Sequence, residues 1–593
     1  MKKSHLRPGK LPIVVRLSSL LVASLLSTTL LAGSWPTYRA DAARSGVTSE
    51  RLGAELALRW VYRPLHAPKP AWPPPAEELA RTNADNAYHV AIDAGHVYFG
   101  SSVTGKVVAV DAEEGTVTWT FFAQGPVRFA PTIAAGRVYF GSDDGHAYSL
   151  DAASGELIWK VRAGPSDEKI LGNGRMISLW PVRTSVLVAD GTAYFAAGVF
   201  PYEGLYVCAL NTDDGSEVWK NDTVGDRAHE LEYGGISPHG YLLASSDVLY
   251  VPSGRAMPAA FDRRTGKFLF YASPGSKRGG TWALLDQGRL IAGVDHSGTP
   301  EKVVYDGRTG ERKGDAFAWF PGIDMSVTPE TAYIVTRDGL VATNRQAYAR
   351  AVEESSQLAE QRKRVARELA AWKKRQSQNG EPTRDQEMAG KIAALTASLG
   401  DLSARREQLR KSSYRWRFSQ QGLTSVVRSG DSVLAGGLGT VLRIAPDTGE
   451  IVWRQSVDGS AVGLAVADGQ LLVSTDTGYV YCFGAPLPAG QTPRTVARAA
   501  APADDDALAA TYREAAKRIV ADAGITKGYA LVLDCGEGRL ACELAQRTEL
   551  KVIGIEKDPA KLAVARARAE AAGLLGARVV IEPWDLESLP DWF

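Results

Sequence analysis

Short runs of alternating apolar and polar residues, separated by tight turns, fill most of this chain. One copy consists of the four runs Val127–Ile133, Gly136–Gly141, His146–Leu150 and Leu157–Trp159. Alternation with a period of two is typical of half-buried strands, because successive side chains point to opposite faces of a sheet. The pattern therefore predicts repeated antiparallel units of four strands.

A turn with the spacing Asp-x-x-x-Gly-x-x-x-Trp recurs between the third and fourth runs. Its aspartate can accept hydrogen bonds from turn amides, and its glycine can adopt the positive φ that closes the turn. A unit repeated about every 40 residues or more predicts a closed array, a β-propeller. The copies are Asp111–Trp119, Asp151–Trp159, Asn211–Trp219, the variant Asp262–Phe270, Ala445–Trp453 without the acid, and Asp306–Gly314 without the aromatic residue.

These tagged turns mark six blades, and the strands around them supply two more. Leu340–Asn344 leaves a sheet and Tyr414–Phe418 returns to it, which predicts a seventh blade with an interrupted turn. The last copy, Val462–Phe483, has three strands, and Leu58–Tyr62 supplies its outer strand. Joining the first strand to the last removes free sheet edges. We expect a mainly β fold with an eight-bladed propeller, or seven blades if the weak copy at Asp306 is not a blade.

The interruption has a helical pattern. Heptad spacing predicts two amphipathic helices, joined by Gln378–Pro382, that pack as an antiparallel coiled-coil hairpin over residues 345–413. The arm would project roughly 40 Å at 1.5 Å per residue. A partner-binding or oligomerisation arm and an inert insertion in a surface turn both fit this pattern. The apolar positions are Ala351, Leu358, Val365 and Trp372, then Leu395, Leu402 and Leu409.

The N-terminus has the order of a secretory signal. Five basic residues between Lys2 and Arg16 precede the apolar stretch Leu17–Leu31, which is short for a membrane span. Ser34 stands where the lipidated cysteine of a lipoprotein signal would be. We therefore expect residues 1–34 to be a signal peptide, with export to the periplasm or the exterior and no lipid anchor. An uncleaved N-terminal membrane anchor is the alternative.

Bulk composition limits the function classes. The 593 residues are 45% hydrophobic and 23% charged, as in an ordinary globular protein. A net charge of +1 provides no overall field that would favour nucleic acid or a membrane surface. The eight histidines show no metal-ligand spacing. None of the four cysteines forms a Cys-x-x-Cys pair, and we expect Cys208 and Cys482 to be buried free thiols.

The tagged turns, together with the segment Trp35–Gly46, resemble the pyrroloquinoline-quinone-like propeller repeat family over residues 35–484. Members include quinoprotein alcohol dehydrogenases and non-catalytic scaffolds of outer-membrane assembly. The dehydrogenases stack their quinone on a disulfide between adjacent cysteines. This chain has no adjacent cysteine pair and no Cys-x-x-Cys-His for a haem. The resemblance therefore favours a binding or scaffold propeller without the quinone, and a quinoprotein oxidoreductase is the third candidate.

Basic residues stand where inner strands are expected to begin, at the mouth of the propeller channel. They are Arg128, Arg183, His239 and Arg255. Converging cations would hold an anionic ligand. The alternative is that they are solvated side chains at the starts of strands. An anionic ligand or a protein bound at this mouth is the partner that the sequence suggests.

After Gly484 the pattern changes. Residues 485–506 are rich in proline and alanine and are typical of a linker. From residue 507 onward, helices alternate with the strands Tyr529–Leu533, Lys551–Ile555 and Arg578–Ile581. This alternation predicts half of a Rossmann-type parallel sheet, so residues 507–593 are expected to form a partial α/β domain.

The first turn of this segment carries candidate chemistry. Gly536-x-Gly538-x-x-Ala541 fits a dinucleotide fingerprint, but a βα turn without a ligand is also possible. Asp534 beside the turn would repel a pyrophosphate and suits the sulfonium cation of S-adenosylmethionine.

Two further acids follow the later strands, and with them the segment resembles the first half of a class I methyltransferase. The resemblance implies that Glu556 binds ribose hydroxyls and that Asp585 binds the adenine amino group; Leu540 replaces the usual third glycine. No fourth strand follows before Phe593, so we expect an incomplete domain, either a fragment of a longer protein or a decayed unit. An active methyltransferase in a longer form, with the propeller recruiting its substrate, is the alternative function.

Overall fold

The computed structural model describes the chain from residue 33 to residue 587, with gaps. Within these residues the protein is mainly β, with five α-helices. Most of the expected signal segment and Arg255 lie outside the described residues. The described ranges are 33–72, 84–172, 174–229, 235–254, 258–271, 282–296, 299–377, 382–496, 502 and 506–587.

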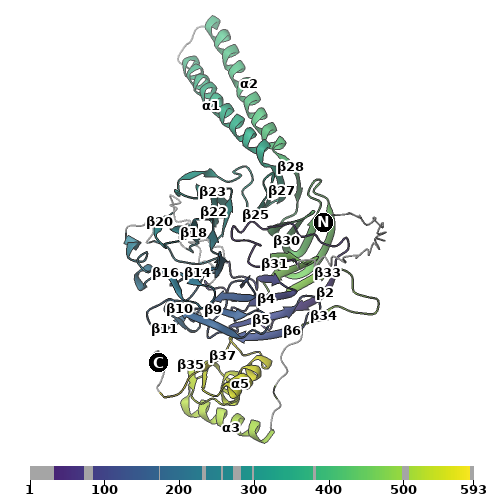
Figure 1. Cartoon of the computed structure of the whole chain (residues 1–593). Helices are drawn as coiled ribbons and strands as arrows, with labels where there is room; N and C mark the ends of the chain where they lie inside the picture. The colour runs from purple at the N-terminus through teal and green to yellow at the C-terminus, as the bar shows by residue number, and fades with distance from the viewer. Residues whose placement is uncertain are drawn as a thin grey trace, which may run out of the picture.

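Six antiparallel sheets of four strands form much of the propeller (Figure 1). The first is β3 (Val90–Asp93), β4 (His96–Gly100), β5 (Lys106–Asp111) and β6 (Val117–Phe122). The second is β7 (Thr132–Ala134), β8 (Arg137–Gly141), β9 (His146–Asp151) and β10 (Leu157–Arg162). The third is β13 (Leu187–Ala189), β14 (Thr192–Ala197), β15 (Tyr206–Asn211) and β16 (Glu217–Asn221).

The next three sheets include the weak copy and the interrupted one. The fourth is β17 (Leu243–Ala244), β18 (Val248–Val251), β19 (Ala259–Asp262) and β20 (Phe268–Tyr271). The fifth, which contains the turn at Asp306, is β21 (Trp282–Asp286), β22 (Arg289–His296), β23 (Thr299–Asp306) and β24 (Arg312–Asp315). The sixth is β25 (Asp324–Val327), β26 (Thr331–Thr336), β27 (Gly339–Asn344) and β28 (Tyr414–Ser419).

A larger sheet joins the two ends of the repeat region. Its order is β1 (Val47–Thr48), β29 (Leu423–Ser429), β30 (Ser432–Ile444), β31 (Ile451–Ala467), β32 (Gln470–Thr475), β33 (Val480–Gly484), β2 (Ala57–Tyr62) and β34 (Arg494–Thr495). Trp60 of β2 lies opposite Cys482 of β33 in antiparallel register. β34 adds to β2 in parallel, so part of the segment expected to be a linker is a strand instead. Arg494 also forms an ion pair with Glu114 at 3.2 Å, which fixes this strand on the propeller.

The aromatic residues of the first four tagged turns pack on the glycine of the next tag. A Cβ on Gly155 would lie 2.6 Å from the ring of Trp119, so this position needs glycine for space as well as for its φ of +74°. The Trp119 Nε1 donates to the carbonyl of Ala152 at 2.9 Å. Trp159 makes the same contact with the turn of the following sheet, at Thr212 and Gly215. The repeated motif thus holds neighbouring sheets together.

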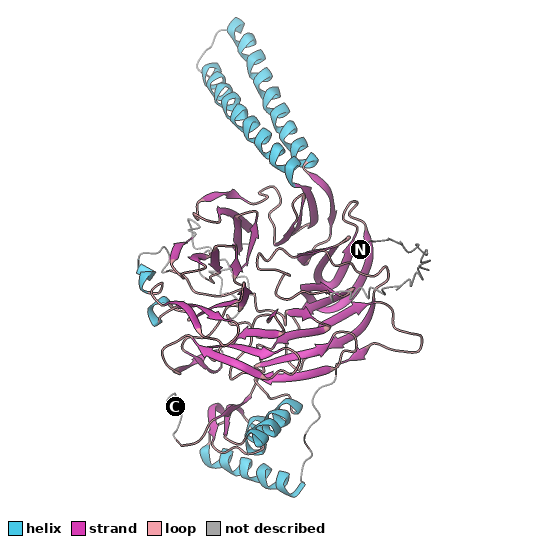
Figure 2. Ribbon diagram, viewed as in Figure 1, coloured by secondary structure: helices cyan, strands magenta, loops and turns pink. Residues whose placement is uncertain are grey.

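The helical arm leaves the sixth sheet between β27 and β28. It consists of α1 (Arg345–Gln376) and α2 (Pro382–Ser412), which lie where the heptads predict helices. Its base also contacts the fifth sheet and the segment after it: Arg345 pairs with Asp286 of β21 at 2.5 Å, and the Tyr348 ring lies 5.3 Å between centroids from Trp319, which follows β24. The arm projects from one side of the propeller, and the C-terminal unit lies on the opposite side (Figures 1 and 2).

The segment from Trp35 to Gly46 connects sheets on different sides of the ring. Trp35 bridges to Ile92 of β3, and Arg39 Nη1 pairs with Asp324 of β25 at 2.8 Å. Arg44, which is fully buried, donates from Nε to the carbonyl of Leu242 at 2.8 Å. This segment therefore passes through the middle of the propeller and stabilises its closure.

The C-terminal unit is a parallel three-stranded sheet with helices. The strands, in the order β35 (Lys527–Val532), β36 (Glu549–Glu556) and β37 (Val579–Pro583), alternate with α4 (Arg539–Arg547) and α5 (Pro559–Ala571) after α3 (Asp506–Ala523). Its strands face the propeller, and α3 lies on the far side (Figure 1). Two 3-10 helices, η1 (Pro201–Glu203) and η2 (Asp226–His229), and the hairpin of β11 (Lys169–Gly172) and β12 (Arg175–Ser178) complete the described elements. None of the described helices is long and apolar enough to cross a membrane.

Candidate functional site

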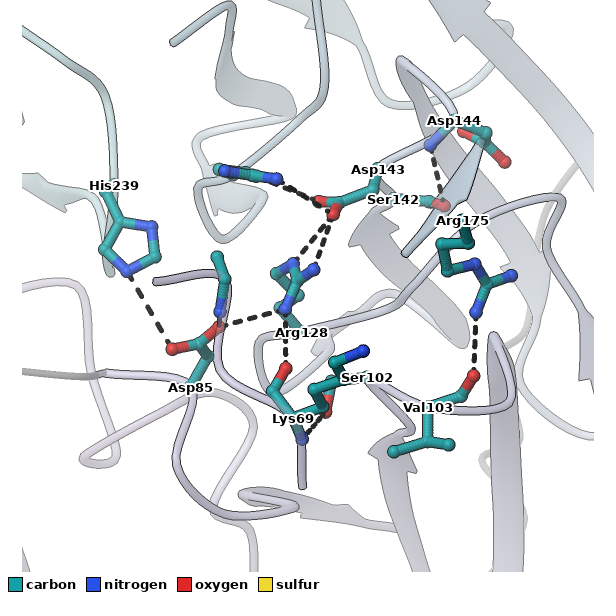
Figure 3. Close-up of polar contacts among 12 residues, drawn as sticks. Lys69, Asp85, Ser102, Val103, Arg128, Ser142, Asp143, Asp144, Arg175 and His239 are labelled. Atoms are coloured by element: carbon teal, nitrogen blue, oxygen red, sulfur yellow. Dashed lines mark hydrogen bonds and ion pairs between the residues drawn. The ribbon is translucent and has the colours of Figure 1, made fainter. Parts of the chain in front are cut away.

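Three of the four basic residues predicted at the channel mouth lie close together. Arg128, Arg183 and His239 are 4%, 5% and 1% exposed, so the interpretation of solvated side chains at strand starts is wrong for them. The reason is that two fully buried carboxylates, Asp85 and Asp143, stand between them (Figure 3). The fourth residue, Arg255, lies outside the described residues.

The carboxylates neutralise both guanidinium groups. Arg128 Nη2 lies 2.7 Å from Asp143 Oδ2 and its Nη1 lies 3.2 Å from Asp85 Oδ2. Arg183 Nε lies 3.4 Å from Asp143 Oδ1. Burial alone would raise the pKa of Asp143, but the guanidinium groups of Arg128 and Arg183 lower it to about 2. Among Arg128, Arg183, Asp85 and Asp143, two cations and two anions therefore balance.

His239 adds no positive charge at neutral pH. Burial lowers its pKa to about 4, although the charge of Asp85 opposes this shift. Its Nε2 lies 3.9 Å from Asp85 Oδ1, which is longer than a hydrogen bond. The ring packs edge-on against Phe129, with 5.5 Å between centroids. His239 is thus a neutral, packed side chain in this cluster.

The channel next to this cluster is filled by aromatic and cationic side chains. The rings of Tyr38 and Tyr241 stack with centroids 3.6 Å apart, and the guanidinium of Arg44 lies 5.8 Å from the Tyr241 ring. Burial raises the pKa of Tyr38 to about 12 and lowers that of Arg44 to about 10. A cavity beside Tyr38 and His89 measures about 20 Å³, which is room for about one water molecule.

The glycine turn of the C-terminal unit is tied to the acid of the second strand. Glu556, at the end of β36 and 1% exposed, accepts from Gly536 N at 2.7 Å and from Asp558 N at 2.9 Å. Gly538 has a φ of +75°, and a Cβ there would lie 3.0 Å from Ala565 of α5. Glycine therefore allows close approach of helix and turn at this position.

The other two predicted acids lie at the ends of the neighbouring strands. Asp534 follows β35 with a φ of +48°, and Asp585 follows β37; both are exposed. Asp585 Oδ1 accepts from Glu587 N at 3.0 Å. Because the strands are parallel and adjacent in the order β35, β36, β37, all three acids stand at one edge of the sheet. This edge presents exposed carboxylates beside one buried, hydrogen-bonded carboxylate.

The cysteines follow the sequence expectation where the structure describes them. All four cysteines are free and buried, which confirms the prediction for Cys208 and Cys482. Burial raises the pKa of the Cys208 thiol to about 12, so it is not a reactive thiolate at neutral pH. Within the described ranges, no group of three or more His, Cys, Asp or Glu side chains is placed to hold a metal ion.

Sequence reasoning missed Asp85 and Asp143, the two carboxylates that neutralise the cluster. Asp143 lies in the turn Ser142-Asp-Asp-Gly145, which in sequence is an ordinary polar turn. Asp143 follows Arg128 by 15 residues and precedes Arg183 by 40 residues, and it contacts both. No local sequence signal shows these contacts. Only the closure of neighbouring sheets into a ring brings them together.

Comparison with known proteins gives matches to propeller repeats. The sequence profile of the family described as "Outer membrane protein assembly factor BamB" matches residues 75–312 and 437–486. Tetrathionate hydrolase of Acidithiobacillus ferrooxidans is 26% identical over 177 residues, which are 29% of this chain and 32% of that protein. The 1-butanol dehydrogenase (quinone) of Thauera butanivorans is 22% identical over 341 residues, 53% of this chain and 54% of that protein.

A solved structure gives a match of the same kind. The crystal structure of quinohemoprotein alcohol dehydrogenase from Comamonas testosteroni is 14% identical, covers 82% of this chain and 85% of its own, and has a TM-score of 0.47. This chain covers about a third of the tetrathionate hydrolase and about half of the 1-butanol dehydrogenase. The repeat match and the relatives support a PQQ-like β-propeller for the repeat region of this chain.

Proposed function

We propose that this protein is an exported, eight-bladed propeller that binds or scaffolds a protein partner and carries an S-adenosylmethionine-binding unit at its C-terminal end. The count of eight is supported by the 17-residue strand β31, whose first half pairs with β30 and whose second half pairs with β32. Dividing the large sheet at β31 yields two blades. Export is supported by the basic and apolar order of residues 1–34.

The filled channel is the observation that carries the proposal of a binding propeller. A cofactor of drug-like size needs a pocket on the order of 300 Å³ or more. The cavity next to Tyr38 and His89 measures about 20 Å³. Arg39 and Arg44, which occupy the same region, are held by Asp324 and by backbone carbonyls. This packing favours a closed structural channel over a quinone site.

The neutral cluster at the mouth favours a protein partner over a small anion. An anion would have to replace Asp143 or Asp85, both fully buried and paired, at a cost of about 3–5 kcal/mol for breaking a buried ion pair. A protein partner needs no such replacement, because it binds through surface area and exposed side chains.

The base of the arm supports its use as a fixed projection. An inert insertion needs contacts only within its own hairpin. In this arm, however, Arg345 forms an ion pair with Asp286 of the fifth sheet, and the Tyr348 ring contacts Trp319 in the segment after that sheet. Replacing residues 349–408 by a short glycine-containing turn keeps this base. We expect an unchanged thermal unfolding midpoint for that variant, whereas Tyr348→Ala lowers it. A large loss of stability in the short-arm variant would show that the distal arm is part of the fold and is not free for a partner.

Quinone binding and alcohol oxidation distinguish the proposed binding propeller from a quinoprotein oxidoreductase. Purified protein is incubated with the quinone and Ca²⁺, and binding is followed by calorimetry together with dye-linked alcohol oxidation. We expect neither saturable binding nor turnover. Alcohol oxidation at roughly 1 s⁻¹ or faster would contradict the proposal and favour the oxidoreductase.

Methyl transfer, with the propeller recruiting the acceptor, is the second candidate function. It is favoured by the three acids at the carboxyl ends of parallel strands, where α/β sheets hold ligands. Calorimetry with S-adenosylmethionine and with NAD, on the whole protein, tests the ligand assignment. We expect the sulfonium compound to bind more tightly, because exposed Asp534 stands beside the turn. Preference for NAD would overturn it.

A further inference from the structure

The sheet of the C-terminal unit is buried on both faces, although its described helices cover one. Side chains alternate along β36, so Val552 points to the helix side, where it joins the core formed with α4 and α5. Ile553 and Ile555 point to the opposite side and are nevertheless 5% and 0% exposed. Something other than a helix of this unit must therefore cover that face.

The propeller supplies the cover. Gly174, in the turn between β11 and β12, leaves no room for a Cβ because Lys551 of β36 reaches it. A Cβ on Gly576 would likewise clash with the Val103 carbonyl, and Phe122 of β6 packs against the core of the C-terminal unit. Figure 1 shows the strands of the unit facing the propeller, with α3 on the far side.

The burial of the sheet follows the extent of this contact. On β35, the strand farthest from β37, Tyr529 is 44% exposed, and Leu533 just after it is 47% exposed. At the other edge, Glu582 of β37 is 4% exposed and lines a cavity together with Phe122. The face is thus buried where the propeller lies and open where it does not.

Polar contacts surround this apolar seam. His66 Nε2 lies 2.8 Å from the Gly573 carbonyl, and Lys106 of β5 forms an ion pair with Glu570 of α5. Arg566 of α5 stacks its guanidinium 4.8 Å from the centre of the Phe122 ring. The seam therefore combines apolar contacts with hydrogen bonds and ion pairs, as specific protein interfaces do.

Two residues of opposite charge line one cavity inside the seam. Arg175 of β12 and Glu582 of β37 are 8% and 4% exposed and line the same cavity. Arg175 Nη1 donates to the Val103 carbonyl at 2.7 Å, whereas Arg175 Nε and Glu582 Oε2 have no hydrogen-bond partner among the described residues. The cavity has about 10 Å³ of free space, enough for about one water molecule.

We propose that the propeller surface around Val103, Phe122 and Arg175 is a docking surface for the open face of the C-terminal sheet, and that the buried charges of Arg175 and Glu582 on one cavity make the stability of this sheet depend on docking. A buried charge without its partner is strongly destabilising. Glu582 on a separated unit would be exposed to water, and Arg175 would lose one of the carboxylates whose charge acts on it. The two units are then stable as one body, with no requirement that the unit bind S-adenosylmethionine.

Hydrogen exchange on the whole protein tests the proposal without any ligand. In Arg175→Met, the amides of β36 and β37 should exchange at least about tenfold faster than in the unchanged protein, because the sheet opens more often. The amides of β26 and β27, in a distant sheet, should not change. Arg162→Met, at an exposed position on β10, is the matched control and should leave both regions unchanged.

A double variant separates the charge pair from simple loss of packing. In Arg175→Met/Glu582→Gln the buried carboxylate is removed together with Arg175, so exchange in β36 and β37 should be slower than in Arg175→Met alone. Glu582→Gln alone, which alters the seam from the other side, should also speed exchange in the sheet. Unchanged exchange in β36 and β37 of Arg175→Met, or effects of the two substitutions that simply add, would overturn the proposal.

Discussion

The channel mouth and the edge of the C-terminal sheet both gather charged side chains at strand ends, yet only one of them leaves charge available. At the mouth, Arg128 and Arg183 are matched by buried Asp143 and Asp85. At the sheet edge, Asp534 and Asp585 are exposed. The same kind of sequence signal, charge where a strand begins or ends, therefore marks a structural network in one place and a candidate binding edge in the other.

The difference lies in what closes over each group of residues. The ring of sheets and the loop that carries Asp85 enclose the mouth cluster, so its charges must pair within the protein. The parallel sheet ends at a turn open to solvent, so the carboxylates of Asp534 and Asp585 are accessible to water. Substitutions at the mouth should change stability, and substitutions of exposed residues at the sheet edge should change binding.

The largest effect is expected for Asp143→Asn. This change leaves Arg128 and Arg183 buried with one carboxylate between them, and breaking a buried pair costs about 3–5 kcal/mol of the free energy of unfolding. Urea denaturation of the propeller measures it. Asp151→Asn, in an exposed turn, is the control and should cost far less.

The pH dependence of the same variant checks the cause. The folded-state pKa of Asp143 is about 2, below the value near 3.9 of an unfolded aspartate. Its stabilising contribution is therefore present above about pH 4 and is lost as the pH falls toward 2. Asp143→Asn should remove this part of the acid sensitivity. An unchanged acid profile would show that the ion pairs are not what the carboxylate contributes.

The second effect is a loss of stability between about pH 6.5 and pH 4 due to His239. Its folded pKa of about 4 lies below the unfolded value near 6.5, so the unfolded state binds the proton first in this window. The loss is on the order of 3 kcal/mol for one such histidine. His89, also buried with a pKa of about 4, contributes similarly. His239→Phe should therefore remove about half of the slope in denaturation experiments across this range; an unaltered slope would contradict burial of a neutral His239.

Regularly spaced features were predictable from sequence, and non-local pairings were not. The tag from Asp151 to Trp159 shows a turn because its residues are neighbours along the chain. The three acids of the C-terminal sheet could be placed at one edge because strand order in a βαβ unit is local. The pairing of Arg128 with Asp85 depends on how a loop crosses the ring, which no periodicity records. The docking of Glu582 next to Arg175 joins residues some 400 positions apart and has no sequence signal at all.

The third effect is expected for Glu556→Gln, at the one buried acid of the sheet edge. Both carboxylate oxygens accept backbone hydrogen bonds, from Gly536 and Asp558. A glutamine keeps one acceptor and turns an amide nitrogen toward the other N–H, which costs about 1–3 kcal/mol in stability of the C-terminal unit. Thermal unfolding followed by hydrogen exchange of β36 measures this. A stability equal to that of the unchanged protein would mean that the turn is held in some other way.

The smallest effect on stability, and the sharpest separation of the two regions, is expected for Asp585→Asn. Asp585 is exposed, and its local bond to Glu587 N is one that an asparagine oxygen also accepts. The free energy of unfolding should therefore stay within about 0.5 kcal/mol of the unchanged protein. If this side chain accepts from the adenine amino group as proposed, loss of its charge should weaken S-adenosylmethionine binding by about 1 kcal/mol, or roughly fivefold in Kd. Calorimetry with S-adenosylmethionine on both Asp585→Asn and Asp143→Asn completes the comparison. Asp143→Asn, at the channel mouth, should lose stability and keep its affinity for S-adenosylmethionine. Equal affinity of Asp585→Asn and the unchanged protein would remove Asp585 from the proposed site.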